Sequence, residues 1–422
     1  MIDLSTASWV EVPAGSDFPL QNLPYGAFIK HDAPRLGIAI GESIFDLCGA
    51  AHAGLFDDVV SPAVLQASTL NPLLACGRHT WTAVRERAIA LLRKDTNLLD
   101  DVNRDSLLVP QAGSRMAMPV QTCDYVDFYS SLEHATNLGK IFRPDGEPLM
   151  PNWRWMPIGY NGRSSTIVVD GTPIIRPAGQ RKPPDASAPS FGPSRQLDIE
   201  LEVGFLTGPG NKMGTRIPVE SARDHIFGLV MVNDWSARDI QAWEYQPLGP
   251  FLGKSFATSV SAWVVTLDAL EPYRVPGPLQ DPLPLPYLEC GEAWNFDIDL
   301  LVELQTQKMR DAGIGAQTVS RSNFKYMYWN MAQQLAHLTV NGTAVRPGDL
   351  CASGTISGPT PDSCGSLIEL TWRGTRPLAL QSGEERSFLE DGDTVVMRGY
   401  CQHLGKPRIG FGGVSGTVLA CV

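Results

Sequence analysis

The chain lacks an excess of basic residues. It has 34 Lys and Arg against 45 Asp and Glu, for a net charge of -11. Proteins whose main task is to grip a phosphate backbone carry the opposite balance, so we expect no nucleic-acid partner. No run of about 18 apolar residues occurs, which predicts no membrane-spanning helix. The first residues also lack the basic start and apolar stretch of a secretory signal, and we expect a cytoplasmic protein.

Closely spaced cysteines are missing as well. None of the eight cysteines follows another at the spacing of about two to four residues that is typical of a zinc knuckle or a redox pair. Disulfides are an alternative, but a chain of 422 residues can bury its own hydrophobic core and does not need them. We therefore expect free, reduced thiols.

Glycine and proline are frequent, with 40 and 33 residues, which favours many turns and short strands over long helices. Short β-rich segments at 27–30, 36–40 and 43–47 precede a helical pattern that begins with Asn71 as N-cap and ends near residue 95. The apolar residues of that helix recur on one face: Trp81, Val84, Ala88, Leu91 and Leu92.

A polar, turn-forming stretch at 111–115 indicates a domain boundary. We predict a small N-terminal β domain over 1–118 and a large, strand-dominated domain over 119–422. The predicted fold class is mainly β with some α-helix.

Three glycine-rich segments imitate known motifs without meeting their requirements. The segment 249–255 has three residues between its glycines, where a P-loop needs four to wrap a phosphate. The serine of 354–358 does not stand centrally between two glycines, as a nucleophile elbow requires. The segment 410–416 lacks the third position of a dinucleotide fingerprint. Nucleotide binding and serine-hydrolase chemistry are therefore not expected.

Acidic residues gather on predicted strands. The segment 197–205 alternates between apolar and other residues, so Asp198, Glu200 and Glu202 would share one strand face. This face is either a solvated acidic surface or a cation site. Asp234 ends an apolar strand over 226–233, where a buried carboxylate is costly unless a cation or a hydrogen-bond donor meets it. Asp127 stands in an equally apolar, aromatic stretch.

Four of these acids, from separate segments, would suit a hard divalent ion such as Mg²⁺ or Ca²⁺: Asp127, Glu200, Glu202 and Asp234.

Basic and polar candidates accompany the acids. A lone histidine is more often structural than catalytic, but His134 shares a short segment with Asp127 and Tyr129, which favours a site. The next candidates have helical spacing and would share one helix face, unless they form an ordinary amphipathic turn: Arg238, Gln241 and Tyr245. Lys254 is a cation among apolar and small residues and requires a partner.

Longer motifs in the chain resemble those of the fumarylacetoacetase family. They lie at 17–26, 127–131, 233–241, 247–256, 323–329 and 352–359. Motifs of this length are far more specific than short patterns, and together they span nearly the whole chain. The resemblance implies a small SH3-like β domain followed by a larger β-roll domain that carries the site, and it implies a homodimer.

The resemblance also implies residue roles. The ligands of the Ca²⁺ or Mg²⁺ that meets the substrate would be the four acids above. A further Mg²⁺ region would involve Lys254 and Thr258 beside Asp234. His134 would be the general base, oriented by Glu369. The groups that stabilise developing negative charge would be Arg238, Gln241 and Lys254. The substrate contacts would be Tyr129, Arg143, Tyr160, Gln241, Tyr245 and Thr355.

The implied reaction is hydrolysis of the C–C bond of 4-fumarylacetoacetate, a small diketo acid, to fumarate and acetoacetate at the last step of tyrosine breakdown. Two alternatives remain at this point. Related enzymes use a similar acidic cradle for acylpyruvate hydrolysis, decarboxylation or isomerisation, although the extra N-terminal domain and Arg143 favour fumarylacetoacetate. A non-catalytic metal-binding scaffold would have no need for His134 together with Glu369.

Overall fold

The computed structural model describes residue 3 and residues 5–422 and confirms a mainly β fold. The N-terminal region contains β1 (Tyr25–Lys30), β2 (Ala33–Ile40), β3 (Ser43–Asp46), β4 (Leu108–Pro110) and β5 (Met116–Ala117). Its helices are α1 (Leu47–His52), α2 (Pro62–Leu65), α3 (Asn71–Ala75), α4 (Arg78–Leu92) and α5 (Asp101–Leu107). The three predicted strands of this region are therefore present.

The helix predicted from Asn71 to about residue 95 is in fact two helices, α3 and α4. Gly77 separates them with a φ of +82°, a left-handed conformation that ends a helix and that glycine adopts without strain. Asn71 is not the N-cap, because its side chain instead bonds the backbone of Gln121 and Pro347. The predicted apolar face of α4 is buried as expected.

The central sheet continues from the N-terminal strands into the rest of the chain. Its strand order is β4-β3-β2-β1-β17-β14-β13-β22-β6-β7. On this path the strands beyond β1 are β17 (Trp263–Thr266), β14 (Ile226–Asp234), β13 (Leu201–Thr207), β22 (Leu350–Ala352), β6 (Tyr125–Phe128) and β7 (Gly159–Asn161), and β16 (Thr258–Val260) pairs with β14 beside it. Because Tyr25 of β1 pairs with Val264 of β17, hydrogen bonds cross the predicted boundary at residue 118. The position of that boundary stays a prediction.

A second sheet lies against the first. Its order is β21-β20-β25-β26-β9, formed by β21 (Gln317–Asn323), β20 (Asp299–Gln305), β25 (Thr394–Cys401), β26 (Ile409–Leu419) and β9 (Ile174–Ile175). Apolar residues of both sheets, such as Met231, Leu300 and Phe411, form one large core. The opposite face of the central sheet packs against the N-terminal helices and gives a second core.

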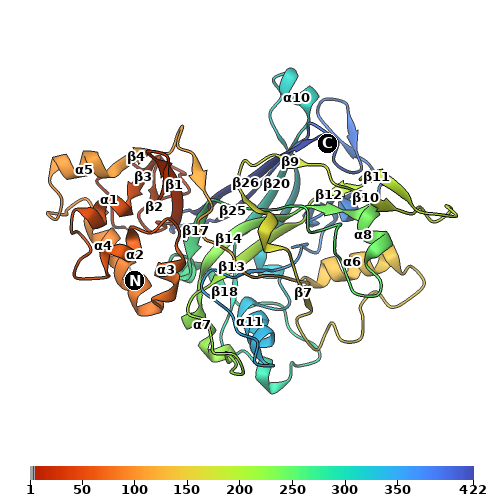
Figure 1. The fold of residues 1–422 in the computed structure, drawn as a ribbon, viewed down its shortest axis with the longest axis horizontal. Helices are drawn as coiled ribbons and strands as arrows, with labels where there is room; N and C mark the ends of the chain where they lie inside the picture. The colour runs from red at the N-terminus through yellow and green to blue at the C-terminus, as the bar shows by residue number, and fades with distance from the viewer. Residues whose placement is uncertain (1–2, 4) are drawn as a thin grey trace.

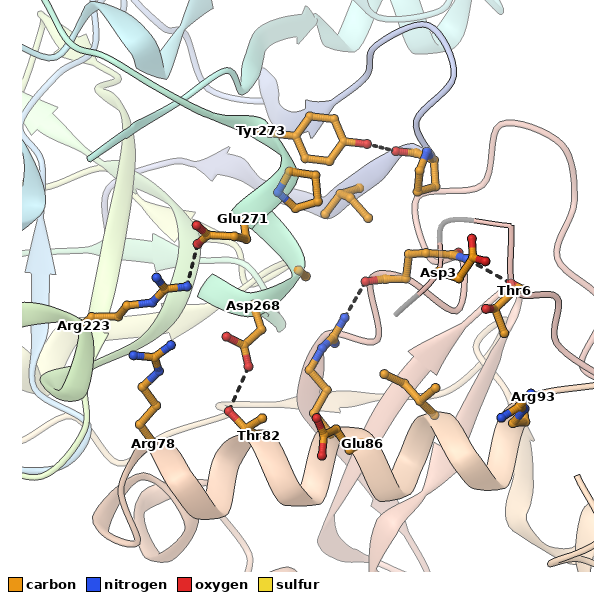
Figure 2. A pocket seen from close by; sticks show the side chains of 17 residues that line it. Asp3, Thr6, Arg78, Thr82, Glu86, Arg93, Arg223, Asp268, Glu271 and Tyr273 are labelled. Atoms are coloured by element: carbon orange, nitrogen blue, oxygen red, sulfur yellow. Dashed lines mark hydrogen bonds and ion pairs between the residues drawn. The ribbon is translucent and has the colours of Figure 1, made fainter. Parts of the chain in front are cut away.

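A polar contact of α4 also joins the N-terminal region to the rest of the chain. Thr82 of α4 donates a hydrogen bond to Asp268 of α9 (Leu267–Leu270) at 3.1 Å, across a groove of about 580 Å³ (Figure 2). Arg223 and Glu271 form an ion pair of 2.7 Å on the far side of that groove. Of these two contacts, only the Thr82–Asp268 bond supplements the shared sheet, because Arg223 and Glu271 both lie after residue 118. The N-terminal region lies at one end of the molecule, opposite α6 (Leu132–Phe142) and α8 (Arg238–Glu244) (Figure 1).

The structure bears on the expected lack of membrane-spanning helices and on the expected state of the cysteines. Within the described residues, every helix is too short or too polar to cross a bilayer. All eight cysteines, which lie in the described part of the chain, are free thiols, as expected.

Candidate active site

The four predicted carboxylates meet at one place in the fold. One ligand oxygen from each of Asp127, Glu200, Glu202 and Asp234 lies within 4.8 Å of the others, and all four residues are buried. Asp127 is on β6, Glu202 on β13 and Asp234 at the end of β14, which are near neighbours in the central sheet. Glu200 lies in the link just before β13. The sheet therefore brings together acids that are up to about a hundred residues apart.

The strand predicted over 197–205 is interrupted, and the interruption changes the role of Asp198. The chain forms β12 (Leu197–Asp198), breaks at Ile199 and Glu200, and resumes as β13. Asp198 therefore does not share a face with the two glutamates. It accepts hydrogen bonds from the Arg238 side chain and from the backbone of Leu367 and Ile368 instead.

Two oxygens of the cluster have no protein donor. Asp127 Oδ1 and Glu202 Oε1 are buried without a hydrogen-bond partner among the described residues. Burial, followed by the charges of neighbouring carboxylates, raises the pKa of both groups well above the ordinary range. Four converging carboxylates, two of them with a free oxygen, are the ligands that a hard divalent cation prefers. The residues present fit a metal ion.

Lys254 has the partners that its surroundings required. Its ammonium group pairs with Glu200 and lies 2.6 Å from Asp234 Oδ2, while Thr258 donates to Asp234 Oδ1 at 2.9 Å. Burial lowers the pKa of Lys254, but the adjacent carboxylates outweigh burial and raise it above the ordinary value. Burial alone would raise the pKa of Glu200, but the charges of Lys254 and Arg238 outweigh burial and lower this pKa to about 2. Lys254 is therefore a protonated donor, and its ammonium group has no lone pair to ligate a second ion.

A histidine and a glutamate from distant segments form a buried pair. His134 lies in the first turn of α6, where its backbone N–H bonds the N-cap side chain of Ser131. Its Nδ1 is 2.7 Å from Glu369 Oε2, and Glu369 belongs to α12 (Leu367–Leu370). Because the carboxylate accepts the Nδ1 proton, Nε2 of the neutral ring keeps a lone pair and can act as a base.

Three further side chains donate to Glu369. Their donor atoms are Asn137 Nδ2 at 2.9 Å, Ser357 Oγ at 2.9 Å and Ser366 Oγ at 2.6 Å. Burial raises the pKa of Glu369, but His134, Ser366 and Asn137 together hold it below the ordinary value. The carboxylate is therefore ionised and ready to stabilise an imidazolium.

A cavity of about 440 Å³ joins the pair to the acidic cluster. The predicted residues that line it are Asp127, Tyr129, His134, Arg143, Tyr160, Glu200, Arg238, Gln241, Tyr245, Lys254 and Thr355. The other predicted residues lie behind this lining: Glu202, Asp234, Thr258 and Glu369. The structure thus gathers the whole predicted set in and around one cavity.

The apolar wall of the cavity was not apparent from local sequence patterns. This wall includes Phe128, Leu138, Phe142, Met150, Ile158 and Leu248. The donors around Glu369 were not predicted either: Asn137, Ser357 and Ser366. Asn137 stands 232 residues from Glu369, so no local pattern could have marked it, whereas Ser366 and Ser357 precede Glu369 by only 3 and 12 residues.

The position two residues after β22, at the site, requires a glycine, and Gly354 occupies it. Its φ is +77°, and a Cβ atom there would lie 2.2 Å from the carbonyl oxygen of Phe128. Its backbone N–H donates to Glu202 Oε2 at 3.1 Å. Because Gly354 has no side chain, its backbone can pack this closely against Phe128 and donate to Glu202, and the chain then continues to Thr355.

Metal binding should strengthen as pH rises. Because the pKa values of Asp127 and Glu202 are raised, each group keeps a proton at pH values where an exposed carboxylate has already lost it, and the ion must displace that proton. Calorimetric titration with Ca²⁺ over about pH 5 to 8 should give a falling Kd with proton release. A Kd that stays constant over that range would contradict the prediction.

Comparison with known proteins agrees with this site. The family described as fumarylacetoacetate (FAA) hydrolase C-terminal matches residues 124–418, and the family described as fumarylacetoacetase N-terminal matches residues 21–119. The fumarylacetoacetase of Homo sapiens is 51% identical over 424 residues, covering 98% of both chains. That of Caenorhabditis elegans is 51% identical over 420 residues, covering 98% of this chain and 99% of the relative.

Solved structures show the same fold at low identity. A fumarylacetoacetate hydrolase from the psychrophilic Exiguobacterium antarcticum aligns over 94% of this chain and 99% of its own, with a TM-score of 0.50 and 17% identity. This likeness concerns the fold alone. The two family matches and the near full-length identity to the curated relatives carry the assignment, and the chain therefore belongs to the fumarylacetoacetase family.

Proposed function

We propose that this protein hydrolyses 4-fumarylacetoacetate to fumarate and acetoacetate, the final step of tyrosine and phenylalanine breakdown. Relatives named fumarylacetoacetase match almost the whole chain at about half identity. The structural observation that carries the proposal is the cavity shared by the His134–Glu369 pair and the four-carboxylate cluster. A non-catalytic metal-binding scaffold would need the four-carboxylate cluster but not the His134–Glu369 pair.

The proposed cofactor is Mg²⁺ or Ca²⁺, held by Asp127, Glu200, Glu202 and Asp234. Oxygen ligands without nitrogen or sulfur support a hard ion. When bound, such an ion would polarise the diketone oxygens and favour the leaving enolate.

His134 acts as the general base. Its Nε2 takes a proton from water as the water oxygen attacks the substrate carbonyl, while Glu369 stabilises the resulting imidazolium through Nδ1. The tetrahedral adduct then loses its C–C bond, and the electron pair leaves with the acetoacetate half. The proton held by His134 can return to that carbon, so the ring ends the cycle neutral.

Three side chains face the charge that develops on the attacked oxygen: Arg238, Gln241 and Lys254. Arg238 Nη1 donates to the Gln241 side-chain oxygen at 3.1 Å, which turns the Gln241 amide N–H groups away to serve as further donors. Preorganised donors of this kind stabilise an oxyanion without reorganising during the reaction.

The proposed substrate contacts are cavity-lining residues. Tyr129 packs edge-on against the His134 ring at 5.4 Å, Tyr160 lies 3.5 Å from Asp234, and Thr355 has a buried hydroxyl without a partner among the described residues. Arg143 supplies a cation for a substrate carboxylate, and Gln241 and Tyr245 complete the set.

The deciding assay follows the loss of diketone absorbance when purified protein is incubated with 4-fumarylacetoacetate and Mg²⁺ or Ca²⁺. Stoichiometric formation of fumarate and acetoacetate is expected. Folded, metal-loaded protein that leaves the substrate intact would contradict the proposal, and acylpyruvates would be tested next.

We also infer a homodimer, which the family resemblance implies. Leu248, Phe251 and Leu252 are 96%, 59% and 51% exposed beside the cavity, and such apolar side chains are often covered in an assembly. Light scattering during size-exclusion chromatography should give twice the chain mass of 45.9 kDa. A mass equal to one chain would contradict this inference.

Two coarser proposals complete the description. The N-terminal family match ends at residue 119 and the C-terminal match begins at residue 124, and this gap supports a domain boundary near residue 118. A cytoplasmic location is supported by the eight free thiols.

A further inference from the structure

Asp198 is a buried carboxylate that belongs neither to the metal cluster nor to the cavity lining. It has no exposed surface. Each of its oxygens accepts two hydrogen bonds. Oδ1 accepts from the backbone of Ile199 at 2.8 Å and of Leu367 at 2.7 Å, and Oδ2 accepts from the backbone of Ile368 at 3.1 Å and from Arg238 Nε at 2.7 Å.

Three of these donors come from two separate parts of the site. Leu367 and Ile368 open α12 and directly precede Glu369, the residue that holds His134. Arg238 opens α8 and reaches the cavity. Pairing of β12 with β15 (Ser236–Ala237) brings Asp198 next to Arg238 in the first place.

Arg238 is held on both sides. Its Nε contacts Asp198, and its Nη2 lies 2.8 Å from Glu200 Oε1 in the metal cluster. The guanidinium therefore has one fixed position, in which its Nη1 bonds Gln241. A shift of Asp198 would move this cation and the Glu369 segment together.

We propose that Asp198 is a positioning residue that holds the Arg238 guanidinium and the Glu369 segment in place on two sides of the cavity. This inference rests on the proposed function of the site. It assigns Asp198 no contact with substrate or metal. Its effect passes through Arg238 to the developing oxyanion and through α12 to the orientation of His134.

Asp198→Asn is the direct test, because an amide keeps the shape but turns two of the four acceptor positions into N–H groups that face other donors. We expect kcat to fall on the order of 100-fold with a smaller change in KM, as for other small misplacements of catalytic groups. The Kd for Ca²⁺ should rise far less than it does in Glu202→Gln, since Asp198 is not a ligand and reaches the cluster only through Arg238. The NMR signal of the His134 Nδ1 proton in ¹⁵N-histidine-labelled protein should shift.

Asp393→Asn is the matched control. Asp393 is also fully buried, pairs with Arg386 Nε at 2.9 Å and accepts a backbone bond from Glu390 at 2.8 Å, but it lies outside the cavity lining. This variant should lose thermal stability while kcat and the His134 signal remain unchanged. A kcat for Asp198→Asn within about 2-fold of the control would overturn the proposal. So would a loss of Ca²⁺ affinity like that of Glu202→Gln, which would place Asp198 in the metal site.

Asp198→Glu serves if the asparagine variant does not fold, because it keeps the charge beside Arg238 while displacing the carboxylate. The same drop in kcat is expected, with a change in Ca²⁺ affinity far smaller than that of Glu202→Gln, and unchanged kcat would overturn the proposal. Failure of the unaltered protein to cleave 4-fumarylacetoacetate would refute the proposed function, whereas the His134 signal would still test the role of Asp198.

Discussion

Replacing His134 with alanine should lower kcat for 4-fumarylacetoacetate hydrolysis by roughly 100-fold to 10,000-fold, the usual contribution of a general base. The ring is the group between Glu369 and the cavity. Without it no side chain is positioned by Glu369 to take the proton of the attacking water. The measurement is steady-state hydrolysis with saturating Mg²⁺ or Ca²⁺.

The variant should remain folded, which makes the result interpretable. Glu369 keeps its bonds from Asn137, Ser357 and Ser366, so its buried charge still has donors. His225→Ala is a suitable control, because His225 bonds the carbonyl of Pro209 at 2.5 Å and lies outside the cavity lining. Near-normal turnover of His134→Ala with metal bound would refute the role of His134.

Removing one cluster carboxylate should abolish metal-dependent activity and remove most of the stabilisation that the metal provides. A metal ion at about 100 times its Kd should stabilise the unaltered protein by about 2.7 kcal/mol. Glu202→Gln should lose most of that gain, because it removes a charged ligand from a fully buried position. Thermal melts with Ca²⁺ and with excess chelator measure both states.

In the metal-free state the same variant should melt at a higher temperature than the unaltered protein. The pKa of Glu202 is raised by burial and by the neighbouring carboxylates Asp127, Glu200 and Asp234, so ionising it near neutral pH costs folding free energy. The sign follows from the raised pKa: the group favours folding while protonated, and that contribution is lost as pH rises through the folded pKa.

Asp349→Asn is the control for the loss of a buried carboxylate. Asp349 accepts backbone bonds from Asp124 and Arg346 and is not part of the cluster. It should destabilise both the metal-free and the metal-loaded protein. A metal-free Glu202→Gln protein that melts below the unaltered one would contradict repulsion within the cluster.

Local patterns predicted much of this structure correctly. The apolar run 226–233 forms β14 and delivers Asp234 to the cluster. The spacing of Arg238 and Gln241 places them on one face of α8, where they bond each other. Such features depend on the period of a strand or a helix, which is written in neighbouring residues. The helix expected from Asn71 failed at Gly77 because a single left-handed residue outweighs the apolar period on both sides of it.

The amino-acid sequence by itself determined which chemical groups this protein possesses and, through its long motifs, the family to which the chain belongs. Only the tertiary structure decided what each group faces. Asp198 and Glu200 follow the same alternation, yet a break between β12 and β13 turns one toward α12 and leaves the other in the cluster. The reason is physical: a buried carboxylate needs donors or a cation that offset its lost hydration, and two of the four donors to Asp198 come from residues 169 and 170 positions away.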